Sequence, residues 1–173
     1  MKNALLFLLL ISLCACDDGD LQIETLDFDS VNLNFCDDPI ATSSNILFKI
    51  NDDETLILTL QSGVLNNGVI GTDTTTTEST VPNQSQVTYR IFSDNVTSTY
   101  FCGDIPPVTP TVIEEIDAED GTVTIKSIMS ADSTLFTHVI ELSGISLVSG
   151  IGERITDLTI SEFGEVTTAV PAN

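Results

Sequence analysis

The stretch Asn45–Leu60, NILFKINDDETLILTL, decides the fold of this chain. Apolar and polar residues alternate with a period of two on either side of Asn51–Glu54, and this alternation is typical of β-strands. The central residues are the asparagine and acidic types that favour tight turns. The stretch therefore predicts a β-hairpin with strands at Asn45–Ile50 and Thr55–Leu60.

The same alternation extends along the chain in both directions. It predicts further strands at Leu21–Thr25, Val31–Phe35, Gln86–Phe92, Thr97–Phe101, Thr111–Ile116, Thr122–Ile128, Thr134–Leu142 and Arg154–Ile160. After the N-terminus, no sustained apolar period of 3.6 residues is flanked by capping signals, and threonine and valine, which favour strands, are abundant. The sequence thus predicts an all-β fold, an antiparallel β-sandwich or barrel-like domain of about nine to eleven strands over residues 21–173.

Turn-forming residues separate the C-terminal strands. Glu119–Gly121, Ser130–Ser133 and the glycine-rich run Gly144–Gly152 carry the residue types that turns favour. The tract Asp73–Thr80, DTTTTEST, has low complexity, and such tracts are typical of an exposed loop or edge. We therefore predict turns at the first set of positions and a loop or sheet edge at Asp73–Thr80.

The N-terminus has the layout of a secretory signal. Lys2 supplies a positive charge, Ala4–Leu13 is an apolar run, and the small residue Ala15 precedes Cys16. About ten apolar residues are too few for a membrane-spanning helix, which needs roughly 20. The sequence predicts that residues 1–15 are a signal peptide that is removed.

The residues Leu13-Cys14-Ala15-Cys16 resemble the lipobox of bacterial lipoproteins. The resemblance implies that Cys16 is lipidated and becomes the first residue of the mature protein. Cys14 is the poorer acceptor, because the bulky Leu13 before it fits the processing pocket badly. The alternative is an ordinary signal peptide that is cleaved nearby.

The acidic residues after Cys16 indicate where the protein is displayed. The run CDDGD at 16–20 is similar to the start of many Bacteroidetes lipoproteins, in which it is associated with export to the outer cell face. The order of segments along the chain also resembles that of short uncharacterised flavobacterial lipoproteins. The matching segments are CDDGD at 16–20, Phe101–Pro107, Gly121–Ile125 and His138–Leu142. The resemblance implies a lipid-anchored outer-membrane protein with a tether at 16–20. A plain linker on a periplasm-facing lipoprotein is the alternative.

The charge of the chain limits its partners. The sequence has 26 acidic against 5 basic residues and a formal net charge of −21. Such a surface repels phosphate backbones and anionic headgroups, so nucleic acid is excluded as a partner and the membrane is reached only through the lipid. A hydrophobic content of 42% marks a folded domain rather than an acidic disordered tail.

Two cysteines remain in the mature chain besides Cys16. Cys36 and Cys102 would lie in an oxidising compartment, where two cysteines usually pair. Each follows a phenylalanine and precedes a predicted turn. Two isolated thiols and one histidine lack the ligand spacing of a zinc site, so we predict a Cys36–Cys102 disulfide.

Catalytic signatures are missing from the sequence. His138, the single histidine, lies in a predicted strand with Phe136 and Ile140 as its alternate neighbours, which favours a structural role. There is no Gly-x-Ser-x-Gly motif, and no catalytic residue is predicted. There is no tryptophan, and the two tyrosines, Tyr89 and Tyr100, are a weak basis for a sugar-binding cleft.

Calcium is the one cofactor that the sequence leaves open. Acidic turns suit a hard cation. The weak candidates are Asp52, Asp53, Asp117, Glu119 and Asp120. None completes an EF-hand spacing, so solvated acidic turns are the preferred interpretation.

These observations predict a non-enzymatic, lipid-anchored envelope protein that displays a β-domain for binding or for a structural role. Its protein or glycan partner is left open. The alternative is a small surface hydrolase that uses a carboxylate pair, as glycosidases do.

Overall fold

The computed structural model describes residues 26–68, 74–150, 154–155 and 161–170 of the chain. The predicted signal peptide at 1–15, the tether at 16–20 with Cys16, and the strand Leu21–Thr25 lie outside these residues. Of the predicted strand Arg154–Ile160, only the first two residues are described.

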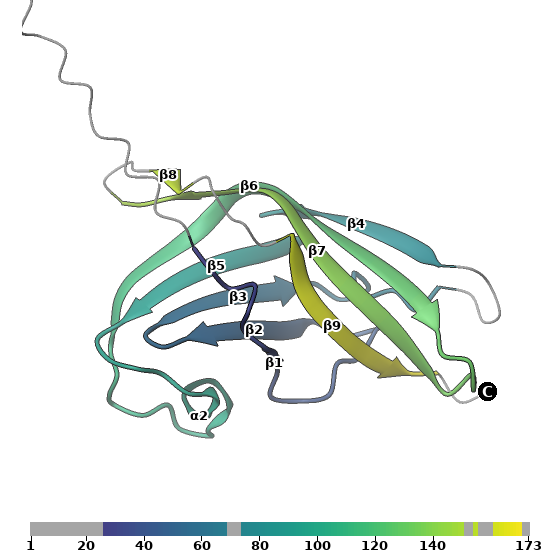
Figure 1. Cartoon of the computed structure of the whole chain (residues 1–173), viewed down its shortest axis with the longest axis horizontal. Helices are drawn as coiled ribbons and strands as arrows, with labels where there is room; N and C mark the ends of the chain where they lie inside the picture. The colour runs from purple at the N-terminus through teal and green to yellow at the C-terminus, as the bar shows by residue number, and fades with distance from the viewer. Residues whose placement is uncertain (1–25, 69–73, 151–153, 156–160, 171–173) are drawn as a thin grey trace, which may run out of the picture.

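Within the described residues, the fold consists of antiparallel β-strands and one short helix (Figure 1). The elements are β1 (Leu33–Asn34), β2 (Asn45–Asn51), β3 (Glu54–Leu60), β4 (Thr75–Val81), β5 (Ser85–Phe92), α2 (Ser98–Cys102), β6 (Val112–Met129), β7 (Leu135–Val148), β8 (Arg154–Ile155) and β9 (Glu162–Ala169). The all-β prediction is confirmed, in its barrel-like form.

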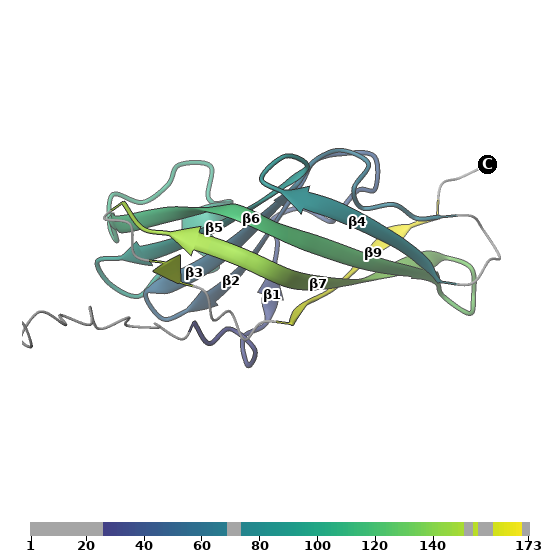
Figure 2. The same cartoon turned by 90° about the horizontal axis from the view of Figure 1, so that it is seen from above.

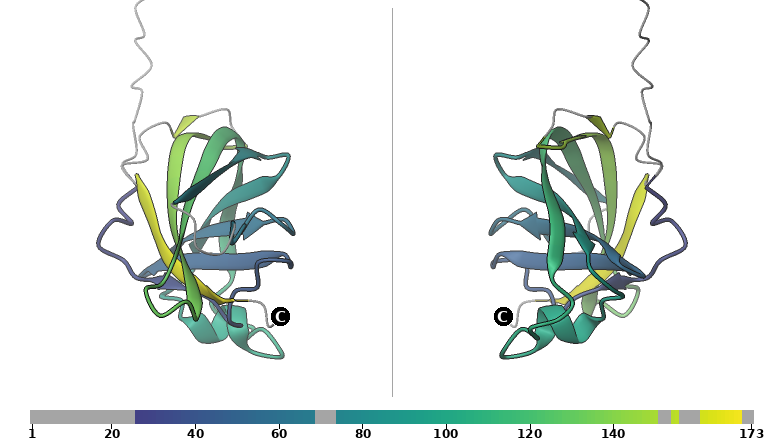
Figure 3. Two further views of the ribbon diagram at one scale, coloured as in Figure 1. Left: turned by 90° about the vertical axis from the view of Figure 1, so that its right-hand side faces the viewer. Right: turned by 90° about the vertical axis from the view of Figure 1, so that its left-hand side faces the viewer.

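One sheet contains all of these strands. Its order is β1-β2-β3-β5-β6-β7-β8, with β4 paired to β6 and β9 paired to β7. The long strands β6 and β7 run the length of the molecule (Figure 2). They pair with each other, and each also pairs with two further strands, β4 and β5 for β6, and β8 and β9 for β7. The sheet curls until β9 comes back to β1 (Figure 3), where a Cβ added to Gly164 would lie 3.0 Å from the Cβ of Leu33. No ladder joins β1 to β9 in the described part, so the barrel is nearly closed.

The concave side of the sheet encloses the main core. One face of each strand supplies it, as Val87 and Tyr89 do on β5, where both are fully buried and alternate with half-buried polar residues. The Tyr89 hydroxyl donates a hydrogen bond to Glu54 Oε1 at 2.7 Å. A buried tyrosine therefore keeps its polar end satisfied while its ring fills the core.

A second apolar cluster lies on the outer face of the sheet, beneath α2. Phe48 stacks on Phe101 with ring centroids 4.5 Å apart, and Phe92 meets Tyr100 edge-on at 4.9 Å. The prediction of a strand at Thr97–Phe101 is wrong, because this segment forms α2. In a strand, adjacent side chains point to opposite faces. In the helix, Tyr100 and Phe101 both reach Phe92.

The predicted turn at Glu119–Gly121 is also wrong, because β6 continues through it. The register shifts between Ala118 and Asp120 and again between Asp120 and Thr122, which marks bulges that bend the strand. Gly121 has φ 141°, and a Cβ there would lie 3.0 Å from the Cα of Ile145. The glycine therefore permits a close strand crossing in place of a turn.

The structure also places the threonine-rich tract and the end of β7. Within Asp73–Thr80, residues from Thr75 onward belong to β4, an edge strand paired with β6, so the edge alternative holds. β9 was not predicted, and β7 extends to Val148, into the predicted turn Gly144–Gly152.

Candidate functional site

The structure brings Cys36 and Cys102 together. Cys36 follows β1 and Cys102 ends α2, and their sulfurs are bonded with the Cα atoms 5.1 Å apart. This separation lies in the range that disulfides require. The bond ties the connection between β1 and β2 to α2 on the outer face of the sheet.

The candidate calcium ligands are spread over two elements. Asp52 and Asp53 form the β2–β3 turn, and their main-chain oxygens accept hydrogen bonds from the Val96 and Phe92 amides at 2.9 and 2.8 Å. Asp52 has φ 55°, a conformation that aspartate tolerates in tight turns. These two residues therefore hold the segment before α2 against the hairpin.

The other three candidates lie on β6. Asp117 Oδ1 accepts a hydrogen bond from Thr88 Oγ1 at 2.6 Å, and Asp120 Oδ1 accepts one from the Gly121 amide at 2.8 Å. Glu119 is exposed. In the described ranges, no three His, Cys, Asp or Glu residues lie close enough to hold a metal ion together.

His138 lies at the centre of a buried chain of hydrogen bonds. Its Nδ1 is 2.7 Å from Ser127 Oγ and its Nε2 is 2.9 Å from Thr168 Oγ1, which in turn donates to Asn67 Oδ1 at 2.6 Å. Because the Thr168 proton goes to Asn67, Nε2 carries the imidazole proton and Nδ1 accepts from Ser127. The chain joins β6, β7 and β9 to the loop after β3.

Burial controls the charge of this histidine. His138 is 0% exposed. Desolvation lowers the pKa of its imidazole from 6.5 to about 4, so the ring is neutral at neutral pH. A side chain this enclosed fits the structural role that the sequence predicts for it.

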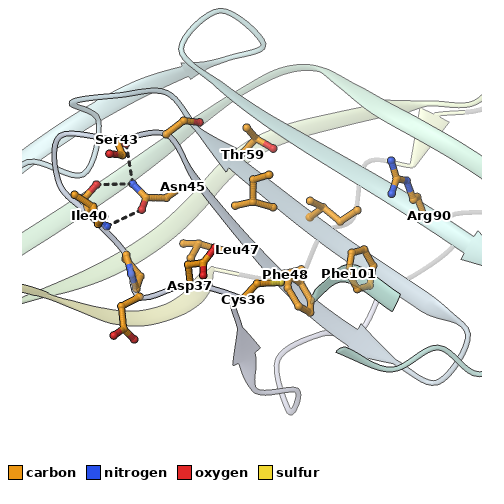
Figure 4. Close-up of a pocket in the computed structure, with 15 residues that line it drawn as sticks. Cys36, Asp37, Ile40, Ser43, Asn45, Leu47, Phe48, Thr59, Arg90 and Phe101 are labelled. Atoms are coloured by element: carbon orange, nitrogen blue, oxygen red, sulfur yellow. Dashed lines mark hydrogen bonds between the residues drawn. The ribbon is translucent and has the colours of Figure 1, made fainter. Parts of the chain in front are cut away.

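A groove of about 600 Å³ lies on the outer face of the sheet, and we call it the outer groove (Figure 4). Its lining residues are Cys36–Ile40, Ser43–Phe48, Ile57, Thr59, Arg90 and Phe101. The chain from Cys36 to Ser44 forms its wall, and β2, β3 and β5 form its floor. Its volume falls within the range of small-ligand sites in proteins.

The wall of the outer groove is exposed except at Pro39 and Ala41, yet it is firmly attached. The Asn45 side-chain amide accepts from the Ile40 main-chain amide at 2.8 Å and donates to the Ile40 and Ser43 oxygens at 2.9 Å (Figure 4). Two serines add side-chain bonds: Ser44 Oγ to the Leu60 oxygen at 2.8 Å and Ser62 Oγ to the Thr42 oxygen at 2.6 Å. With the disulfide at Cys36, these contacts fix the wall at both ends.

The floor is apolar at one end and charged at the other. Ile46 and Ile57 supply the apolar part, and Arg90 lies at the far end (Figure 4), where it pairs with Glu115 on β6. Asp37 and Asp38 stand on the wall, are exposed, and take part in no ion pair or hydrogen bond within the described residues. The outer groove therefore has an unneutralised acidic rim.

A second hollow, of about 650 Å³, lies where β9 approaches β1. Lys49 lines it, is nearly fully buried, and donates to the Phe28 oxygen at 2.9 Å. Burial lowers the pKa of its ammonium group, and the charges of Asp29 and Glu162 oppose this shift. Lys49 is thus held by a main-chain acceptor in a buried position, and we assign it a structural role.

The sequence pointed to only part of the outer groove. It singled out Cys36 and Cys102, but it gave no reason to connect Asn45 or Arg90 with them. The available signal for Asn45 was its position at the start of an apolar strand, which suits a side chain that caps a turn.

No family model, no curated protein and no solved structure matches the chain. Among the residues that the structure describes, no helix combines the length and apolar character needed to cross a bilayer.

Proposed function

We propose that this protein is a non-enzymatic, lipid-anchored envelope protein of the outer membrane and that it binds a partner in the outer groove. The N-terminal motif that ends at Cys16 supports the anchor. The attached wall of the outer groove supports binding, and it is the observation on which the proposal depends.

The wall supports a binding function because it is already ordered in the absence of a ligand. An exposed segment normally moves freely, and ordering it on binding costs free energy. Here the Asn45 amide, two serine hydroxyls and the disulfide hold it before any ligand arrives. A partner would therefore meet a surface that is already shaped.

The hydrolase alternative has less support. A glycosidase needs two carboxylates that face each other across a cleft. At the outer groove, Asp37 and Asp38 are neighbours on one exposed wall, and Glu115 is paired with Arg90. We therefore prefer binding to catalysis.

Site-specific photocrosslinking tests the groove. With a benzophenone side chain in place of Ile46, we expect irradiated cells to yield covalent adducts of the protein. The same side chain in place of Ile128 is the matched control, because Ile128 is also an exposed isoleucine but lies on β6, outside the outer groove. If Ile46 gives no more adduct than Ile128, the outer groove is not the binding surface.

Exchange of single cysteines tests the anchor. We expect Cys16→Ala to release the protein from the membrane fraction and Cys14→Ala to leave it attached, because only Cys16 follows a small residue, Ala15. Membrane fractionation with metabolic lipid labelling measures both. Lipid label on the Cys16→Ala protein would refute the assignment.

A further inference from the structure

The electrostatics of the outer groove favour a cation. Asp37 and Asp38 face solvent without a basic partner in the described chain, and Arg90 forms an ion pair with Glu115. The chain as a whole carries a formal charge of −21. An anionic ligand would be repelled by both the rim and the rest of the surface, whereas a basic one would be attracted.

The groove also exposes apolar side chains beside that rim. Ile40 is 55% exposed on the wall and Ile46 is 58% exposed on β2. Phe101, which is half-buried, lies on the same surface above Phe48. A ligand with apolar groups between its charges would remove this surface from water.

The edge of β2 is unpaired next to these side chains. β1 pairs with Lys49 and Phe48, so in the described chain Ile46 has β3 on one side and no strand on the other, and it is exposed, whereas Asn45 and Leu47 on either side of it are buried. The wall segment lies nearby without forming a ladder with it. An unpaired strand edge offers amide and carbonyl groups to an extended peptide.

We propose that the outer groove binds an extended polypeptide segment in which basic and apolar residues alternate. This inference rests on the proposed binding function and names the chemistry of the partner. The basic side chains lie toward Asp37 and Asp38 on the wall, the apolar ones cover Ile46 on the floor, and the peptide main chain follows the edge of β2 at Ile46. Alternation suits this geometry because successive side chains of a strand point to opposite sides.

Direct titration with short synthetic peptides tests the proposal. The full-length protein in neutral detergent is titrated with three fluorescent probes, in which lysine and valine, glutamate and valine, or lysine and serine alternate. We expect the lysine–valine peptide to bind, the glutamate–valine peptide not to bind, and the lysine–serine peptide to bind about tenfold more weakly. Equal binding of the lysine–valine and lysine–serine peptides, or binding of the glutamate–valine peptide, would overturn the proposal.

Paired variants locate the binding. We expect Asp37→Asn with Asp38→Asn to weaken lysine–valine binding about tenfold. Glu78→Gln with Glu119→Gln removes the same charge from exposed positions on β4 and β6 and should change the affinity less than about twofold. Equal losses in both double variants would mean that net charge alone attracts the peptide, which overturns the proposal.

The two proposals fail in distinguishable ways. If the benzophenone at Ile46 yields adducts but no lysine–valine peptide binds, the groove is a binding site and the basic-peptide inference is wrong. If neither experiment succeeds, both the groove function and the inference are wrong.

Discussion

Replacing Cys36 and Cys102 together by alanine is expected to lower the free energy of unfolding by about 4 kcal/mol. The bond closes a loop with a sequence separation of 66 residues, and its loss restores that loop-closure entropy to the unfolded chain. Small domains are stable by only about 5–15 kcal/mol, so the change is a large share of the total. The same bond fixes Cys36 at the start of the groove wall, so we also expect weaker binding there.

Urea unfolding of the oxidised and reduced proteins measures this effect. The unfolded chain becomes more expanded without the bond, so the denaturant slope should rise while the midpoint falls. Reductant should shift the midpoint of the natural protein and leave the alanine variant unchanged. A reductant-insensitive midpoint in protein isolated from the envelope would show that the thiols are not bonded there.

The second large effect concerns acid and His138. The imidazole binds a proton near pH 6.5 in the unfolded chain but only near pH 4 in the folded one. Between these values the unfolded state holds more protons, so stability falls as pH decreases. The full shift corresponds to a loss of about 3 kcal/mol, complete below about pH 4. Above about pH 6.5 this contribution is fully present.

Comparison with His138→Gln isolates the histidine from the many carboxylates that titrate in the same range. Glutamine can accept from Ser127 and donate to Thr168, but it does not titrate. We expect the difference in unfolding free energy between the two proteins to shrink or reverse as pH falls from 6.5 to 4. Parallel pH profiles would contradict the buried, neutral assignment of the ring.

The central hairpin was predictable because local and tertiary signals agree there. β2 and β3 match the predicted Asn45–Ile50 and Thr55–Leu60 to within one residue at each end, and β5 matches Gln86–Phe92 equally well. In each case, period-two alternation reflects one face that is buried in the main core. The residues of Asn51–Glu54 are turn formers, and Asp52–Asp53 form the turn between the two strands.

Other elements could not be predicted because contacts distant in sequence decide them. Thr97–Phe101 has strand-forming residues. In the structure the rings of Tyr100 and Phe101 both contact Phe92, and a helix places these adjacent side chains on the same side. Gly121 lies among residues that favour turns, yet in the structure its lack of a side chain allows Ile145 to approach the strand closely. In β9 the register shifts opposite Ile140 and Glu141, so the alternation that would reveal a strand is broken near Gly164.

Only part of the candidate site was predictable from the sequence. The pairing of Cys36 with Cys102 was predicted from the cysteine count and from the oxidising compartment that the N-terminal motif implies, and the structure joins the predicted pair. The groove itself depends on Asn45 holding the wall and on the short length of β1, which leaves part of β2 unpaired. Neither feature has a periodic signature in the sequence.

The position of the disulfide determines how mechanical tension would travel through an anchored molecule. A pull from the N-terminal side first meets Leu26 and Phe28, which are buried in the main core, and then β1, which pairs with Lys49 and Phe48. The load then arrives at Cys36 and passes across the sulfur bond to Cys102. The intervening chain, which includes β2, β3, β4 and β5, is a closed loop that a pull on the chain ends cannot extend while the bond is intact. The wall and the floor strands of the outer groove would therefore stay together when the N-terminal side is pulled.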